Sequence, residues 1–101
     1  MIKILVVCDM GMTSSLIMQK MNKVASDKNI EVKVEACPIE ELENYLEGTQ
    51  AILVSPQIRF RIDEIKNEVG GNIVVQLIDT RDYGLGRGDK ILEKTLQAIN
   101  Q

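Results

Sequence analysis

The chain has 101 residues, of which 45 % are hydrophobic and 27 % are charged, and this composition predicts one domain spanning residues 1–101. Its net charge of −3 and isoelectric point near 4.9 argue against nucleic acid as a partner, because phosphate backbones bind basic surfaces. No apolar run approaches the roughly 20 residues that cross a bilayer, so no membrane insertion is predicted. The first residues show no signal-peptide cleavage pattern, and we therefore expect a cytoplasmic protein.

The chain contains two cysteines, Cys8 and Cys37, and no histidine. The cysteines are far apart in sequence and form no CxxC pair, so both are expected to be free thiols in a reducing compartment. Two thiols without histidine are too few ligands for a structural zinc ion, and neither a metal nor a cofactor is predicted. Any chemistry that needs an imidazole must therefore use a histidine of a partner.

Apolar patterns typical of strands and helices alternate along the chain. The expected strands cover about residues 2–7, 30–36, 51–54 and 72–78, and the expected helices cover about 14–28, 38–45, 58–69 and 89–100, with 79–88 as a loop. The continuous aliphatic run at 2–7 indicates a central buried strand, whereas the alternation of apolar and charged residues at 30–36 indicates a strand nearer an edge. This order predicts an α/β fold with a parallel sheet, right-handed crossovers and helices on both faces.

The segment Cys8–Ser15, with sequence CDMGMTSS, joins the first expected strand to the first expected helix. Unpaired N–H groups at a helix N-terminus attract anions, and Gly11 allows the backbone to wrap closely around one. Thr13, Ser14 and Ser15 can cap the helix and donate hydrogen bonds to phosphate oxygens. The same field favours a thiolate, which makes Cys8 a candidate nucleophile.

Two observations oppose this interpretation. Asp9 places a negative charge beside the thiol unless it points into solvent, and an anion there repels phosphate. Free cysteines are also often buried, so Cys8 could instead be a small apolar residue that ends a strand.

Other phosphate-binding loops fit the segment less well. The G-x-x-x-x-G-K-[ST] and G-x-G-x-x-G motifs are absent. Low-molecular-weight tyrosine phosphatases use C-x5-R on a similar strand–loop–helix, but Ser14 stands where that arginine would be. A general acid could be sought between Asp79 and Asp82, so a phosphatase-like or arsenate-reductase-like thiol enzyme remains the alternative. The missing arginine favours a carrier, which must protect its phosphoryl group from water.

Three segments together resemble the IIB component of the lactose/chitobiose (cellobiose) family of the bacterial sugar phosphotransferase system: Cys8–Leu16, Ser55–Ile58 and Ile78–Gly84. The resemblance covers essentially the whole chain and implies a three-layer sandwich around a four-stranded parallel sheet of order 2-1-3-4. It implies that Cys8 accepts a phosphoryl group from a histidine of a IIA protein. Cys8 would then pass this group to a sugar of the β-glucoside, chitobiose or lactose class, held by a membrane IIC protein.

The resemblance also implies which residues hold the thiophosphate, namely the rest of the loop: Asp9, Met10, Gly11, Met12, Thr13, Ser14 and Ser15. Asp9 and Met10 depart from the family pattern, where smaller or uncharged residues are usual. A possible partner-binding rim comprises Pro56, Gln57, Arg59, Arg61 and Tyr83. For the arginines the alternative is a solvated helix face, and for Tyr83 it is core packing. Cys37 is interpreted as structural, because no glycine-rich or hydroxyl-rich loop follows it.

Overall fold

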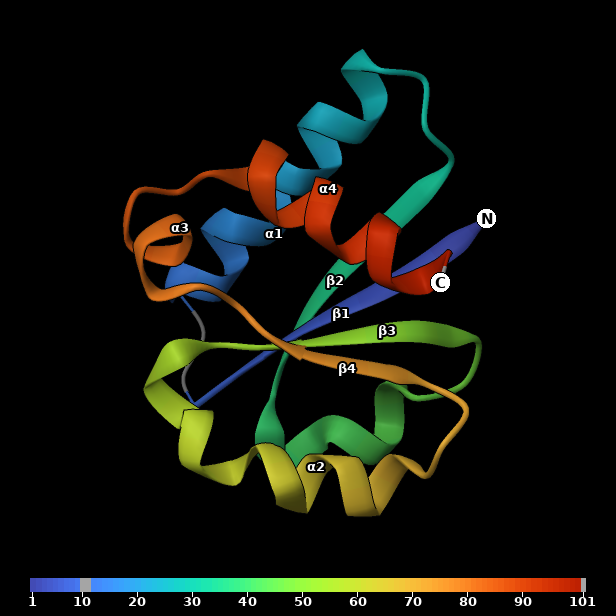
Figure 1. Ribbon diagram of the computed structural model, residues 1–101, viewed down its shortest axis with the longest axis vertical. Coiled ribbons are helices and arrows are strands. Elements are labelled where there is room, and N and C mark those ends of the chain that lie inside the picture. Colours follow the sequence, from blue (N-terminus) through green and yellow to red (C-terminus); the bar gives the residue numbers. More distant parts are fainter. Residues whose placement is uncertain (10–11, 101) are drawn as a thin grey trace.

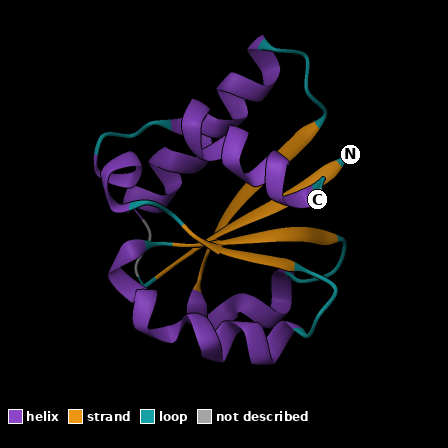
Figure 2. Cartoon of the chain, in the orientation of Figure 1, coloured by secondary structure: helices purple, strands orange, loops and turns teal. Residues whose placement is uncertain are grey.

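The computed structural model describes residues 1–9 and 12–100. Its four strands form a parallel sheet of order β2-β1-β3-β4, as expected (Figures 1 and 2). Helices α1, α3 and α4 cover one face of the sheet, while α2 and the 3-10 helices η1 and η2 cover the other (Figure 1). The elements in chain order are β1 Ile2–Cys8, α1 Met12–Asp27, β2 Val32–Pro38, η1 Ile39–Tyr45, β3 Thr49–Val54, η2 Pro56–Arg61, α2 Ile62–Val69, β4 Val74–Leu77, α3 Thr80–Gly84 and α4 Gly88–Ile99.

Strand β1 lies between β2 and β3, which confirms the prediction of a central strand. Its side chains alternate between two separate cores, because successive residues of a strand point to opposite faces. Ile4 and Val6 belong to the core beneath α1 and α4, whereas Leu5 and Val7 belong to the core against η1 and α2. Burial on both faces explains why this segment is continuously aliphatic.

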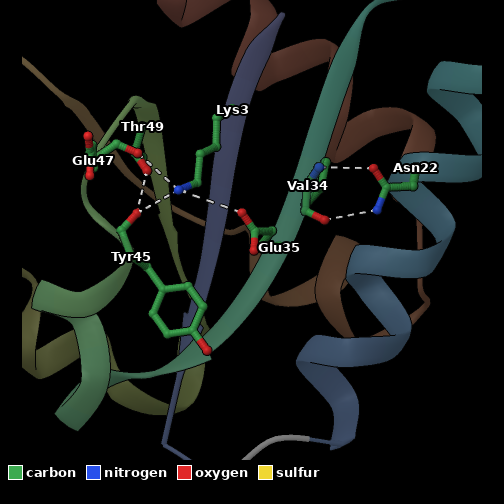
Figure 3. Close-up of polar contacts among 7 residues, drawn as sticks. All are labelled: Lys3, Asn22, Val34, Glu35, Tyr45, Glu47 and Thr49. Atoms are coloured by element: carbon green, nitrogen blue, oxygen red, sulfur yellow. Dashed lines mark hydrogen bonds and ion pairs between the residues drawn. The ribbon is translucent and has the colours of Figure 1, made fainter.

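Strand β2 is at an edge of the sheet, also as predicted, and a side chain of α1 covers part of that edge. The amide group of Asn22 accepts a hydrogen bond from the Val34 backbone N–H at 2.9 Å and donates one to the Val34 carbonyl at 2.9 Å (Figure 3). The amide thus takes the place of a neighbouring strand at this point. Blocking an edge in this way limits unwanted pairing with another chain.

Two expected helices begin differently from the prediction. Pro38 ends β2, opposite Cys8 in the register, and is also the N-cap of η1, so the expected helix begins one residue later, at Ile39, and is a 3-10 helix. Proline is tolerated there because the end of an edge strand needs no further N–H donor. The stretch after Pro56 is not one α-helix, since η2 precedes α2 and Ile58 departs from helical geometry with φ −117° and ψ 27°. The apolar stripe is nevertheless correct, because Ile58 and Ile65 are both buried.

The predicted loop at 79–88 contains the short helix α3, which sequence periodicity did not reveal. Asp79 caps this helix, because its Oδ1 accepts hydrogen bonds from the backbone N–H groups of Arg81 at 2.9 Å and Asp82 at 3.0 Å. Gly86, with φ 65°, allows the chain to turn after α3. A single helical turn of five residues is too short to produce a recognisable apolar pattern.

Polar side chains at the amino end of the sheet are closely connected (Figure 3). The Lys3 ammonium donates to the backbone carbonyls of Tyr45 at 2.9 Å and Glu47 at 3.0 Å, and it lies 3.6 Å from a Glu35 carboxylate oxygen. The Thr49 hydroxyl donates to the same Tyr45 carbonyl at 2.8 Å. These bonds fasten the end of η1 to the starts of β1 and β3.

In the described part of the chain, no helix is long and apolar enough to cross a membrane.

Candidate active site

Cys8 is the last residue of β1, at the carboxyl end of the central strand, where the sequence analysis placed the candidate nucleophile. The residue is only 1 % exposed. Its Sγ lies 4.0 Å from the backbone carbonyl oxygen of Cys37 on the neighbouring strand, which is a weak contact for a thiol donor. The thiol is therefore shielded from bulk water, and its contact with the described residues is this weak one.

The chain leaves β1 toward α1 on one face of the sheet and leaves β3 toward η2 on the other (Figure 1). The carboxyl ends of β1 and β3 therefore flank the switch point of the sheet, which is where parallel α/β proteins bind ligands. The N-terminus of the 16-residue helix α1 lies at the same edge, and it supplies backbone N–H groups and partial positive charge for an anion. Cys8 thus lies at the end of a strand, beside the switch point of the sheet and at the edge where α1 begins.

The first turn of α1 is held by a hydrogen bond to α3. Ser14 is completely buried, and its Oγ lies 3.1 Å from Tyr83 Oη, with either hydroxyl able to donate. Ser14, a predicted phosphate ligand, therefore already has a partner within the fold. Tyr83 is 6 % exposed and packs in the core beneath α1, so the core-packing interpretation is the one that describes its ring.

The other predicted loop residues are only partly described. Asp9 is exposed, as expected if its charge points into solvent, where water screens it from the thiol. Ser15 is partly buried within α1. Met10 and Gly11 lie outside the described residues, as do the side chains of Met12 and Thr13.

Some side chains of the predicted partner-binding rim are exposed, whereas others are buried or already bonded within the fold. Pro56 is buried at the start of η2, and Gln57 is exposed. Arg59 is exposed, and its guanidinium donates to the Pro56 carbonyl at 3.0 Å. These three residues follow the carboxyl end of β3, as the rim prediction requires.

Arg61 is committed to carboxylates of its own surroundings rather than to a phosphate. Its guanidinium lies 2.7 Å from a Glu64 oxygen and 3.6 Å from a Glu40 oxygen. The hydrogen bond with Glu64 is the main reason that the pKa of Arg61 is raised above its ordinary value. Arg61 is therefore no substitute for the arginine that a low-molecular-weight phosphatase carries in its loop.

The acidic residues that could serve as the general acid of a phosphatase also have partners within the fold. Hydrogen bonds from the backbone N–H groups of Asp82 and Arg81 lower the pKa of the Asp79 carboxyl, which makes it a poor general acid. The buried Asp82 carboxylate lies 2.9 Å from the Lys94 ammonium and 3.5 Å from the Arg87 guanidinium. Asp82 is therefore already paired with two cations of its own fold, and this geometry disfavours a role for it in phosphate hydrolysis.

Cys37 has the environment of a structural cysteine. It is 2 % exposed, and burial is the main cause that raises the pKa of its thiol to about 12. A thiol that stays protonated at neutral pH is a poor nucleophile. Among the described residues, no group of three or more Cys, Asp or Glu side chains is arranged to hold a metal ion.

The structure adds residues that the sequence analysis did not select. Leu16, Phe60 and Leu85 are large apolar side chains that are 54 %, 79 % and 61 % exposed, and they follow the carboxyl ends of β1, β3 and β4. We call these three residues the apolar rim. Only Phe60, flanked by Arg59 and Arg61, had a local signal in the sequence. Exposed apolar side chains at one edge of a sheet are typical of a protein-binding surface.

Comparison with known families gives one consistent result. The family model described as "PTS system, Lactose/Cellobiose specific IIB subunit" matches residues 3–94. The cellobiose-specific EIIB component of Lactococcus lactis subsp. lactis (strain IL1403) is 33 % identical over 100 residues, covering 92 % of each chain. The galactose-specific EIIB component of Lactococcus lactis subsp. cremoris (strain MG1363) is 32 % identical with the same coverage. The oligo-beta-mannoside-specific EIIB component of Bacillus subtilis (strain 168) is 33 % identical and covers 98 % of each chain.

Solved structures agree with these relatives. The solution structure of a cellobiose-specific phosphotransferase IIB component from Borrelia burgdorferi is 35 % identical, with a TM-score of 0.80, and the match covers 98 % of this chain and 92 % of that one. The lactose-specific IIB domain from Streptococcus pneumoniae has a TM-score of 0.82 at 20 % identity, with 96 % of each chain covered. At that identity the second structure supports the fold alone.

Proposed function

Because the chain belongs to the lactose/cellobiose-specific IIB family of the sugar phosphotransferase system, a family of phosphotransferases, we propose that Cys8 is its phosphoryl-carrying residue. The observation that carries this proposal is the position of Cys8 at the carboxyl end of the central strand, the edge of the sheet at which α1 begins. The donor is the phosphohistidine of a IIA protein. The acceptor is a sugar hydroxyl presented by a membrane IIC protein.

Two transfers make up the proposed reaction. In the first, the Cys8 sulfur attacks the phosphorus of the IIA phosphohistidine, the N–P bond breaks as the S–P bond forms, and the thiol proton is left on the imidazole nitrogen. In the second, a sugar oxygen attacks the same phosphorus, the S–P bond breaks as the O–P bond forms, and the hydroxyl proton returns to the Cys8 sulfur. This chain has no histidine, so the imidazole must come from the partner.

The protein contributes position and charge stabilisation to these transfers. The N–H groups at the start of α1 offset the negative charge that the phosphoryl group brings to Cys8. Burial of Cys8 keeps water from the S–P bond, and Ser14 stands where a hydrolase would carry an arginine. The site is therefore suited to hold a phosphoryl group without hydrolysing it.

The apolar rim is the proposed docking surface for the IIA protein. Its side chains follow three strands at the edge that carries Cys8, together with the exposed Gln57 and Arg59. A mixture of exposed apolar and polar side chains matches the composition of transient protein interfaces. The arginine offers a charge to an acidic or phosphorylated surface. We expect both partners to be met from the cytoplasm, with residues 1–101 acting as one EIIB domain.

The sugar is proposed only as a class. The relatives are described as specific for cellobiose, galactose and oligo-beta-mannosides, which supports a sugar of the β-glucoside, chitobiose or lactose class for this chain. The carrier presents a phosphoryl group and does not need to enclose the sugar. We therefore propose that the IIC protein makes the finer choice.

Intact-mass measurement tests the proposal directly. The protein is incubated with phosphoenolpyruvate, the general phosphotransfer proteins and a IIA protein, and we expect it to gain one phosphoryl group. Cys8→Ser should gain none, while the matched control Cys37→Ser should gain one as the unaltered chain does. No gain by the unaltered chain, or a gain that persists in Cys8→Ser, would contradict the proposal.

A further inference from the structure

Ser55 follows directly after β3 and is completely buried. Across the described residues 1–9 and 12–100, its Oγ is the one buried side-chain oxygen or nitrogen that has no hydrogen-bond partner. A hydroxyl that loses its bonds to water and gains none in the protein destabilises the fold. The presence of serine at this position therefore calls for a reason other than stability.

The register of the sheet places Ser55 beside Cys8. Val7 pairs with Val54, and the Ser55 backbone N–H donates to the Val7 carbonyl at 3.0 Å, so the ladder continues past the last paired residues. The next residue on β1 is Cys8. Ser55 and Cys8 are therefore neighbours across the two strands that flank the switch point.

The alternation of side chains places both residues on the same face. Val7 and Val54 point into the core against α2, whereas Val6 and Leu53 point into the core beneath α1. Ser55 keeps extended backbone geometry, with φ −67° and ψ 148°, so the alternation continues through it. The Ser55 hydroxyl and the Cys8 thiol accordingly share the face covered by α1, the helix whose N-terminus is offered to the phosphoryl group.

Polar groups on this face differ in how well they are satisfied. Ser14 and Tyr83 satisfy each other at 3.1 Å. Cys8 has a weak contact of 4.0 Å to the Cys37 carbonyl, and Ser55 Oγ has no partner. Among these four described side chains, the poorly satisfied ones are thus the neighbours Cys8 and Ser55. A phosphoryl group on the Cys8 sulfur would place charged acceptor oxygens between them.

We propose that Ser55 is a positioning residue for phosphorylated Cys8: its hydroxyl is unpaired while Cys8 is a thiol and donates a hydrogen bond to a phosphoryl oxygen once the S–P bond has formed. This inference rests on the proposed function of Cys8. It explains why an unsatisfied hydroxyl is kept in a buried position, because its hydrogen bond exists only in the phosphorylated state. The bond stabilises phosphocysteine relative to the phosphorylated IIA donor.

Ser55→Ala tests this assignment through the transfer equilibrium. Hydrogen bonds to charged groups are strong enough that losing one should shift the equilibrium about tenfold or more toward phosphorylated IIA. The ratio is measured by intact mass after mixing the protein with a known amount of phosphorylated IIA. The ³¹P resonance of the phosphocysteine should also move in Ser55→Ala. The melting temperature of the unphosphorylated variant should equal or exceed that of the unaltered chain, since no bond is lost.

Two further variants make the test selective. Thr95→Val removes another buried hydroxyl, one that already donates to the Ile91 carbonyl at 2.7 Å, and it should leave the equilibrium and the ³¹P resonance unchanged. Ser55→Thr keeps a hydroxyl and should retain the equilibrium of the unaltered chain. This retention would show that the hydroxyl, and not the volume of the side chain, is responsible.

The possible outcomes separate the two proposals. An unchanged equilibrium and ³¹P resonance in Ser55→Ala overturn the role of Ser55 while leaving Cys8 as the carrier. A lower melting temperature with an unchanged equilibrium also overturns it, in favour of a structural role. If the unaltered chain accepts no phosphoryl group, the proposed function itself fails, and the role of Ser55 fails with it.

Discussion

The two ends of the sheet differ in how well their polar groups are hydrogen-bonded. At the amino end, Lys3 and Thr49 donate hydrogen bonds to the backbone carbonyls of Tyr45, the last residue of η1, and of Glu47 just after it (Figure 3). At the carboxyl end, Cys8 has one weak contact and the Ser55 hydroxyl has no partner in the described structure. Satisfied polar groups contribute to the stability of a fold, whereas buried groups without partners commonly mark a functional site.

The surfaces around the two ends differ as well. The apolar rim of Leu16, Phe60 and Leu85 is exposed at the carboxyl end, while the polar groups near Lys3 are joined to one another. A protein that meets its partners at one edge needs the opposite edge only for stability. Substitutions at the amino end should therefore change the free energy of unfolding without changing phosphoryl transfer, and substitutions at the carboxyl end should change both or transfer alone.

Lys3→Met should produce the largest loss of stability among such substitutions. It removes the donors to the Tyr45 and Glu47 carbonyls and the ion pair with Glu35, which we expect to lower the free energy of unfolding by about 2 kcal/mol. Urea denaturation measures this change. Lys33, the register partner of Lys3, is exposed, and Lys33→Met should change stability by less than about 0.5 kcal/mol.

Phosphoryl acceptance by Lys3→Met, measured under conditions where the variant is folded, should equal that of the unaltered chain. Slower or weaker phosphoryl acceptance by the folded variant would contradict the idea that the amino end serves stability alone. It would show that the connection between η1 and β1 also controls the position of Cys8.

Tyr83→Phe should have a smaller effect on stability, of about 1 kcal/mol, because it leaves the buried Ser14 hydroxyl without its partner. Tyr45→Phe is the matched control, since Lys3 and Thr49 bond to the backbone carbonyl of Tyr45 and not to its hydroxyl. A double-mutant cycle with Ser14→Ala isolates the bond. Additive effects of Ser14→Ala and Tyr83→Phe would refute the coupling and with it the proposed support of the first turn of α1.

Ionisation of the Cys37 thiol should have the smallest effect on the free energy of unfolding near neutral pH. Its pKa is raised by burial from 9.0 to about 12, so at neutral pH the thiol is protonated in both the folded and the unfolded chain. Above pH 9.0 the unfolded chain ionises first, and the stability contributed by this thiol is lost as the pH rises toward 12. Comparing the pH dependence of unfolding for the unaltered chain and Cys37→Ala measures this contribution.

The raised pKa of the Cys37 thiol also predicts that this residue is labelled in the denatured chain and not in the folded one. In Cys8→Ser, where Cys37 is the remaining thiol, iodoacetamide at pH 9.0 should react with the denatured chain and spare the folded one. Comparable rates in the two states would show that Cys37 is not protected by burial.

Much of the fold could be predicted because it depends on local patterns. The aliphatic run of β1 and the alternation in β2 indicated a central and an edge strand, and both positions are confirmed. The errors occurred where the pattern was too short or too ambiguous. The five residues of α3 carry no apolar period, and η2 and α2 share one apolar stripe although their backbones differ.

The candidate site was predictable in part for the same reason. A thiol between a buried strand and a helix is visible in the sequence, and so is the lack of an arginine at Ser14. The partner of each side chain is not visible, because the hydrogen bond between Ser14 and Tyr83 joins residues 69 positions apart. The pairing of Arg61 with Glu40 likewise depends on the packing of η2 against η1.

The sequence by itself determined the alternation of strands and helices, the central place of β1 and the location of Cys8 at its carboxyl end. These features follow from the periodicity and order of neighbouring residues. Only the tertiary structure decided that Ser55 lies beside Cys8, that Ser14 is bonded to Tyr83 and that the side chains of the apolar rim remain exposed. Those arrangements depend on which strands pair and in which register, and strand register is set by the packing of the whole sheet and not by any one segment.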